Sequence, residues 1–350
     1  MAQPSETPKY PIIDSHIHLY PSSELSTLAW NSPTSPLNKQ FSLEEYAAIT
    51  GSPDTLEGFI FLETDRKSSV DPGADGNGWE MPLVEVEWLK RIALGTPKSG
   101  EGHTAEDKRL CLAIIPWAPL PGGAAAMEKY VAEVEKHAGE SFSKIRGFRY
   151  LVQDKPKGVM LQDEFIEGLK WLGKKGYVFD LGVDQHSGGK WQLEEAVEMV
   201  TRAHEGVPEE EKVVFIINHL CKPDLSIYNP TDPSFVAWKT AMFNLGKCSN
   251  TYMKLSGCFE EMSESLKTKS VEEIFEAIQS RLVIVMATFG AFRIMYGSNW
   301  PVCTIGVEDS WKKWVQVVQR FCYMAGLTQE EQIMIWSGTA IKAYGIKELL

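Results

Sequence analysis

Two histidines one residue apart, His16 and His18, are the first side chains of the sequence that could carry chemistry. They lie in the run PIIDSHIHLYP, which is typical of a strand that ends in a loop. Side chains alternate along a strand, so both imidazoles should point to one side and Ile17 to the other. Two imidazoles on one face can bind one divalent ion when other strands supply further ligands. A pair of polar surface residues would have the same spacing.

Two further strand ends carry polar groups. In VVFIINHLCKPD an apolar run ends at Asn218 and His219, and Lys222 follows in the turn. In RIMYGSNWPVC small residues precede Asn299 and Trp300, which lets a ligand approach the backbone. A histidine at a strand end is often only structural, so each motif alone decides little. Together they place polar groups where strands end.

Five more side chains are candidates for substrate binding, and each has a structural alternative. Glu63 ends an apolar run but could be a salt-bridged loop residue. Arg149 suits bidentate binding of a carboxylate or a lactone carbonyl, or a buried ion pair with Glu63 or Asp180. His186 follows a strand in a loop that could turn it to solvent. Lys222 could bind an anionic product, and Trp300 could form an apolar wall or simply pack.

The elements that must position these residues alternate between short apolar runs and longer amphipathic segments. The predicted strands are 12–17, 58–63, 110–117, 145–150, 177–183, 213–219, 251–256 and 293–297. The predicted helices are 79–94, 124–137, 165–175, 193–204, 235–245, 271–282, 311–325 and 329–344. This α/β pattern predicts a (β/α)8 TIM barrel with the last helix appended to it.

Two long inserts, 21–39 and 68–78, each follow a predicted strand. Loops after strands form the active-site face of such a barrel, so we expect both inserts at the C-terminal face, as substrate lids or as spacers. No linker divides the chain. We therefore expect one domain over residues 1–350, with residues 1–10 as a flexible N-terminal tail.

The amino-acid composition of the chain limits the classes of partner that it can bind. The 350 residues include 35 basic and 47 acidic ones, a formal charge of -12, so the average surface repels nucleic acid. No secretory signal and no run of 18 apolar residues is present, which favours a cytoplasmic protein without membrane contact. The six scattered cysteines fit reduced, packed thiols. A small-molecule substrate is the expected partner, and a homodimer stays open.

Five motifs together resemble the amidohydrolase superfamily, in particular its TIM-barrel lactonases of the L-fuconolactonase and L-rhamnono-gamma-lactonase types. In chain order they are IIDSHIHLY, KIRGFRYLVQ, FIINHLCKPD, YMKLSGCFE and RIMYGSNWPVC, and each lies at a predicted strand. The resemblance covers nearly the whole chain. It implies that His16, His18, His219 and Asn299 surround a reacting water, with the three histidines as ligands if a divalent ion is bound.

Asn299 departs from the family pattern, which has an aspartate at this position. A neutral amide cannot act as a base near pH 7, and it is a weaker metal ligand than a carboxylate. The sequence is therefore compatible with one bound divalent cation, for which zinc is the first candidate, and equally with a site that works without a metal. Three interpretations follow: a metal-free hydrolase with another base, a protein with changed chemistry or binding only, and an engineered inactive variant.

The leading hypothesis is hydrolysis of a small cyclic ester, an aldonolactone, by water held among His16, His18 and His219. Arg149 or a bound ion would stabilise the developing oxyanion. An alternative is hydrolysis or decarboxylation of an aromatic-pathway lactone or acid, with Arg149 and Lys222 binding carboxylates. An alternative from another class is a barrel that binds such a ligand without turning it over.

Overall fold

The eight predicted strands are all present in the computed structural model, which describes residues 8–73, 78–346 and 349. They are β1 (Ile12–Ile17), β2 (Leu56–Leu62), β3 (Cys111–Ile115), β4 (Gly147–Arg149), β5 (Val178–Leu181), β6 (Val214–Ile217), β7 (Thr251–Leu255) and β8 (Ile294–Tyr296). Residues 1–7 of the predicted tail lie outside the described residues. Pro8 and Tyr10 from its described part are buried, so the tail does not extend to residue 10.

The strands form the wall of a (β/α)8 barrel in two parallel sheets, β1-β2-β3 and β4-β5-β6-β7-β8. One seam between the sheets is closed by a parallel bridge between Ile114 and Ile145. The other is closed by a parallel bridge between Ile17 and Trp300. The predicted α/β barrel is confirmed, and its C-terminal strand ends meet at one face.

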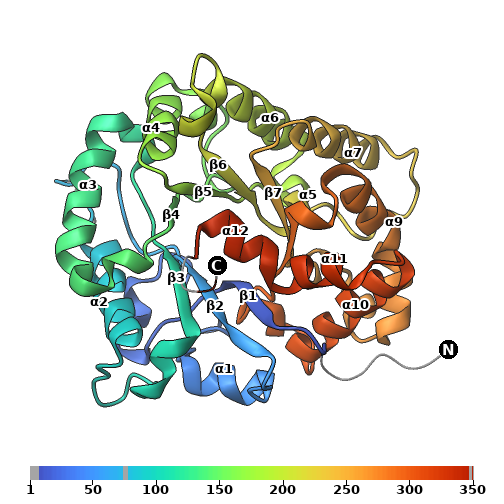
Figure 1. Ribbon diagram of the computed structural model, residues 1–350, viewed down its shortest axis with the longest axis horizontal. Coiled ribbons are helices and arrows are strands. Elements are labelled where there is room, and N and C mark those ends of the chain that lie inside the picture. Colours follow the sequence, from blue (N-terminus) through green and yellow to red (C-terminus); the bar gives the residue numbers. More distant parts are fainter. Residues whose placement is uncertain (1–7, 74–77, 347–348, 350) are drawn as a thin grey trace.

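Helices ring the strands in Figure 1. They are α2 (Glu80–Leu94), α3 (Gly123–Ala138), α4 (Asp163–Lys174), α6 (Lys190–His204), α7 (Pro233–Gly246), α9 (Val271–Phe289) and α10 (Ser310–Met324), close to the predicted segments. Three shorter helices, α1 (Leu43–Thr50), α5 (Gln185–Gly188) and α8 (Glu264–Lys267), were not predicted. No helix within the described residues is long and apolar enough to cross a membrane.

The appended C-terminal helix is present but interrupted. It consists of α11 (Gln329–Ile333), a π-helical turn (Met334–Gly338) and α12 (Thr339–Tyr344). In Figure 1, α12 lies across the centre of the ring. Tyr344 belongs to one apolar cluster with the inward-facing strand residues Ile13 and Val178. This helix therefore closes the end of the barrel at which the strands begin, opposite the predicted site.

An irregularity in β1 determines which of its side chains face the barrel interior. The pairing register with β2 shifts between Asp14 and Ile17. Ile13 packs inside the barrel before the shift, whereas Ile17 packs on the outside after it. His16 and His18 follow the inward phase, with their Nε2 atoms 3.2 Å apart. The predicted alternation of the two histidines with Ile17 is confirmed.

The buried Asp14 carboxylate fastens β1 to the last part of the barrel. Its Oδ1 accepts a hydrogen bond from the Ser298 backbone N–H at 2.8 Å. Its Oδ2 accepts hydrogen bonds from the Tyr46 hydroxyl and the Trp311 indole N–H, both at 3.0 Å. All three partners can only donate to it in this arrangement. The carboxylate thus joins β1, α1, α10 and the loop that follows β8.

We expect Asp14→Asn to lower the free energy of unfolding by about 3 kcal/mol, because the amide NH₂ would face a buried donor instead of accepting from it. Urea unfolding of the full chain measures this change. Asp54→Asn, at an exposed aspartate, is the matched control and should change stability by less than about 0.5 kcal/mol. Equal unfolding midpoints for the two variants would contradict the role given to Asp14.

Candidate active site

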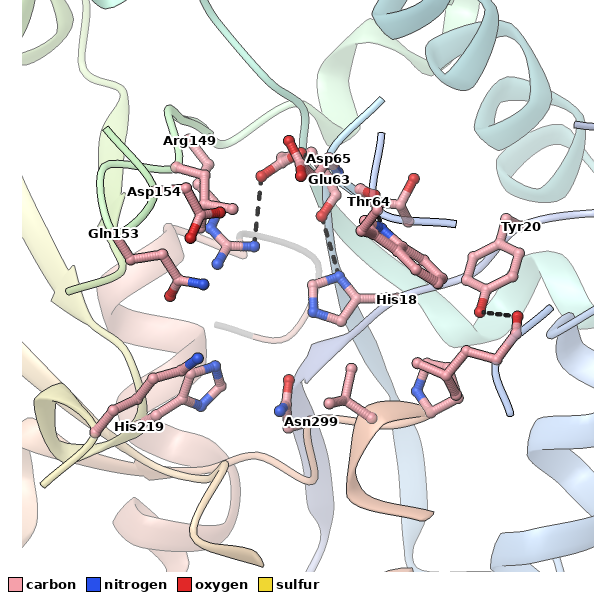
Figure 2. Close-up of a pocket in the computed structure, with 16 residues that line it drawn as sticks. His18, Tyr20, Glu63, Thr64, Asp65, Arg149, Gln153, Asp154, His219 and Asn299 are labelled. Carbon is pink, nitrogen blue, oxygen red and sulfur yellow. Dashed lines mark hydrogen bonds and ion pairs between the residues drawn. The ribbon is translucent and has the colours of Figure 1, made fainter. Parts of the chain in front are cut away.

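A cavity of about 270 Å³ opens where the strands end. Of the predicted site residues, it is lined by His18, His219, Asn299, Arg149, Glu63 and Lys222. Figure 2 shows Arg149 and Glu63 facing each other on one side, with His219 and Asn299 on the other side and His18 between them. Trp30 and Leu37 from the insert 21–39 also line the cavity, so this insert lies at the C-terminal face as expected.

Two predicted substrate-binding residues lie outside this cavity. The His186 Nδ1 is 2.7 Å from the Glu261 carboxylate, and its Nε2 is 3.7 Å from that of Asp224. These carboxylates attract the imidazole away from the cavity. Trp300 is buried and packs edge-on against aromatic rings of the β1–α1 segment, among them Tyr46. The structure thus gives both side chains packing or ion-pair contacts in place of the expected substrate contacts.

His16 lies beneath His18, buried below the cavity surface. The His18 Nδ1 is 3.0 Å from the carbonyl oxygens of both Leu62 and Glu63. Carbonyl oxygens only accept, so this nitrogen carries the ring hydrogen and Nε2 carries the lone pair. The His219 ring lies 4.4 Å from the His16 ring, measured between centroids. The structure therefore brings the three predicted histidines together.

His219 is held by an unusual loop. Residues 219–222 all have positive φ, although none is glycine, which costs roughly 1–2 kcal/mol for each residue. The His219 Nδ1 lies 2.8 Å from the Ser256 hydroxyl. A Cβ atom at Gly257 would lie only 2.4 Å from the same nitrogen. The Ser-Gly pair after β7 therefore both bonds the imidazole and leaves space for it.

A buried ion pair beneath the histidines was not predicted. The Lys254 Nζ is 2.6 Å from the Asp180 carboxylate and 3.3 Å from the His16 Nδ1. The Tyr344 hydroxyl donates to the other Asp180 oxygen at 2.8 Å. Burial lowers the pKa of Lys254 to about 8, and Asp180 opposes this shift. In the sequence, Asp180 and Lys254 are each a single charged residue inside an apolar strand. This pattern indicates that each has a buried partner of opposite charge.

Burial keeps the histidines neutral. It lowers the pKa of His18 to about 3, with the nearby Arg149 charge lowering it further. Burial, together with Lys254 and Lys222 respectively, also holds the pKa values of His16 and His219 well below the usual range. Neutral imidazoles can donate or accept hydrogen bonds here, but they are weak bases near pH 7.

The pKa of Glu63 is raised, whereas the pKa values of the histidines are lowered. Burial raises the pKa of its carboxyl group to about 7, and Arg149 limits the rise. One carboxyl oxygen accepts the Asp65 backbone N–H at 2.5 Å, and the other lies 3.4 Å from the Arg149 guanidinium. A carboxyl group with a pKa near neutrality can both take up and release a proton, which is the requirement for general acid–base catalysis.

A second carboxyl group lies next to Asn299. The Glu260 carboxyl oxygens are buried, and burial raises the pKa of this group to about 7, while the Asn299 side chain lowers it. The Asn299 Oδ1 is itself buried and makes no hydrogen bond within the described residues. Glu260 does not line the cavity. No motif in the sequence distinguishes Glu260 from the adjacent Glu261, so Glu260 was not among the predicted residues.

The histidine cluster has the spacing of a metal site, but the charges around it disfavour a divalent cation. The His16 and His18 Nε2 atoms are spaced as on one tetrahedral zinc, which would set roughly 3.3 Å between two ligands. However, the predicted ligands include no carboxylate that would offset the charges of Lys254 and Arg149, which lie beside the histidines. Among the residues that the structure describes, no group of three or more His, Cys, Asp and Glu side chains is arranged to hold a metal ion.

Comparisons with known proteins agree on one family. A family model described as Amidohydrolase matches residues 99–346. The L-rhamnono-gamma-lactonase of Scheffersomyces stipitis is 35% identical over 347 residues, which cover 97% of this chain and 99% of that protein. The L-fucono-1,5-lactonase of Burkholderia multivorans is 26% identical over 279 residues, which cover 76% of this chain and 84% of that protein.

Solved structures agree on the fold. The crystal structure of an amidohydrolase from Burkholderia multivorans with bound zinc has a TM-score of 0.70 and 22% identity. It covers 96% of this chain, and the match spans 99% of that chain. At this identity the likeness shows the barrel fold, and the zinc is a property of that protein.

We expect His18→Gln to make stability less sensitive to acid. The His18 pKa is about 3 in the folded chain and about 6.5 when unfolded, so the unfolded chain binds one more proton in between. That contribution to stability is present above pH 6.5 and is lost as the pH falls toward 3. Between pH 6 and 5 the variant's unfolding free energy should therefore fall less steeply, by about 1 kcal/mol per pH unit.

Urea unfolding of both chains at pH 5, 6 and 7.5 measures this difference. Above pH 7 the two stabilities should run parallel, which serves as the internal control. Identical slopes below pH 6 would show that His18 is not held neutral.

Proposed function

The chain belongs to the amidohydrolase family, and we propose that it hydrolyses a lactone of a sugar acid. The observation that carries this proposal is the pairing of Glu63, whose pKa is raised to about 7, with Arg149 on one side of a cavity that also contains neutral imidazoles. A base and an oxyanion-stabilising cation are what ester hydrolysis needs. The names of the lactonase relatives support the substrate class.

The charges of the cavity favour a neutral, hydroxyl-rich substrate. The carboxyl groups of Glu63, Asp65 and Asp154 line it, against the two cations Arg149 and Lys222. Carboxylates accept hydrogen bonds from sugar hydroxyls, but they repel a substrate that carries several carboxylates. The aromatic-pathway acid is therefore the weaker alternative. Such a substrate would need an excess of cations at this surface.

In the proposed reaction the ionised Glu63 carboxylate takes a proton from a water molecule as the water oxygen attacks the lactone carbonyl carbon. The carbonyl oxygen becomes an oxyanion, which the Arg149 guanidinium stabilises. The bond between the carbonyl carbon and the ring oxygen then breaks. The ring oxygen receives the proton from Glu63, and the product is an open hydroxy acid.

Asn299 has a limited part in this proposal. Its Oδ1 can accept a hydrogen bond from the attacking water and orient it, but it takes no proton. Because Glu63 supplies a carboxylate, the chain needs neither an aspartate at position 299 nor a divalent cation to deprotonate water. This removes the main argument for a barrel that only binds its ligand, and for an inactive variant. Zinc at His16, His18 and His219 is not part of the proposal.

We also propose that residues 1–350 form one domain, that the protein is cytoplasmic and that its partner is a small-molecule substrate. A homodimer stays open.

Lactone turnover tests the proposed function. We expect the native chain to release acid from L-rhamnono-gamma-lactone or L-fucono-1,5-lactone, with no effect of a chelator on the rate. A pyrone dicarboxylate lactone should be turned over at least roughly 100-fold more slowly, because its charges meet three carboxyl groups. Activity that appears only in Asn299→Asp, or only after added zinc, would overturn the metal-free proposal.

The pH profile tests Glu63 as the base. The free carboxylate accepts the proton, so kcat/KM should rise with pH through about 7 and then level off. Arg149, Asp65 and Glu85 are the charged groups that set this pKa. Glu63→Gln should lower kcat/KM by roughly 100- to 10,000-fold and abolish the acidic limb.

Glu260→Gln is the matched control, because it removes a carboxyl group with a similar pKa outside the cavity. The acidic limb should survive in this variant. If the limb disappears with Glu260 and persists without Glu63, the base is assigned to the wrong carboxyl group.

A further inference from the structure

A column of hydrogen bonds runs from the closed end of the barrel to the cavity, and the proposed reaction does not use its lower part. Tyr344 donates to Asp180 at 2.8 Å, and Asp180 lies 2.6 Å from the Lys254 ammonium group. Lys254 lies 3.3 Å from the His16 Nδ1, and the His16 Nε2 lies 3.2 Å from the His18 Nε2. Lys254 and Asp180 are fully buried, so the column is shielded from water.

Both ends of this column have fixed donor and acceptor roles. The His18 Nδ1 faces two backbone carbonyl oxygens, so the lone pair of this ring is on Nε2. An ammonium group only donates, so the lone pair of the His16 ring must be on Nδ1, toward Lys254. The ring hydrogen of His16 is then on Nε2 and points at the His18 lone pair. With the other tautomer, an N–H would face the ammonium and two lone pairs would face each other.

We infer that Lys254 is a positioning residue that holds His16 in the tautomer matching that of His18, so that their Nε2 atoms form a donor–acceptor pair beneath the cavity. Asp180 and Tyr344 hold the ammonium group in place for this purpose. The Lys254 Nζ also lies 5.4 Å from the centre of the Tyr344 ring, within the range of a cation–π contact. The C-terminal helix thus takes part in ordering the far end of the site.

This arrangement has a consequence for metal binding. Two imidazoles that ligate one cation through Nε2 must both have a lone pair there. For His16 this would require a hydrogen on Nδ1, directly against the Lys254 ammonium group. In many metal sites the second nitrogen of a ligating histidine donates to a carbonyl or carboxylate, as His18 does here and His16 does not. Lys254 therefore opposes a cation at this pair.

The catalytic relevance of this inference rests on the proposed function, but the tautomers can be measured without any substrate. Long-range ¹H–¹⁵N correlation spectra of the full chain with ¹⁵N-labelled histidine report which ring nitrogen carries the hydrogen. At pH 7 we expect His16 as the Nε2–H form and His18 as the Nδ1–H form. Spectra of His16→Gln and His18→Gln assign the two signals.

A paired variant tests the role of Lys254 directly. Lys254→Met with Asp180→Asn removes both charges together, keeps a side chain of similar length and leaves Tyr344 an acceptor. In this variant no cation opposes a hydrogen on the His16 Nδ1, so His16 can present its Nε2 lone pair to a metal. The affinity for Co²⁺, measured by calorimetry and visible absorption, should therefore rise roughly tenfold or more. Lys222→Met is the matched control, because it removes a nearby cation that has no contact with His16 among the described residues.

Co²⁺ affinity in the control should change much less than in the paired variant, and its His16 tautomer should not change. An Nδ1–H form of His16 in the native chain would overturn the inference, and so would equal Co²⁺ binding by the native chain and the paired variant. If the paired variant does not fold, the native spectrum alone decides. Correct tautomers without lactone turnover would refute only the proposed function, whereas turnover with the opposite tautomers would refute only this inference.

Discussion

The closure of the barrel between its first strand and the loop after its last strand is the constraint on which the site depends. Buried Asp14 accepts two hydrogen bonds across this seam, from Ser298 and Trp311, and a third from Tyr46 in α1. Beside it, the Asn299 N–H donates to the His16 carbonyl at 2.9 Å, and the His18 N–H donates to the Trp300 carbonyl at 2.7 Å. The histidines and Asn299 are thus set in register by the backbone. Motifs about 280 residues apart share one cavity only because this seam closes.

Burial then gives the histidines and the glutamate of the site different chemical roles. The same loss of solvent that lowers the pKa of His18 to about 3 raises that of Glu63 to about 7, because burial disfavours the charged form of either group. The imidazoles become neutral hydrogen-bonding groups, and the carboxyl group becomes the best base. A site that looks from its sequence like a histidine site is thus expected to depend on a glutamate for proton transfer.

Sequence patterns predicted the parts of this protein that depend on local periodicity. Apolar runs identified all eight strands, and alternation placed His16 and His18 on one side. The contacts of Lys254 with Asp180 join positions 74 residues apart, and no local pattern reports such a pair. The direction of His186 depends on carboxylates in two other loops, Glu261 and Asp224. The raised pKa of Glu63 depends on burial, which only the folded chain defines.

Asn299 departs from the family pattern, and its surroundings give a physical reason for this departure. Its φ is 61°, a left-handed conformation that asparagine and aspartate both tolerate better than most residues, so the backbone does not decide between them. The Glu260 carboxyl group lies beside it and is already difficult to ionise. An aspartate at position 299 would place a second carboxylate against the first, and like charges at this distance raise each other's pKa. The amide avoids that repulsion and stabilises the ionised form of Glu260. Asn299 and Glu260 are therefore best understood as one unit, in which the amide at the end of β8 supports a buried carboxyl group in the loop after β7.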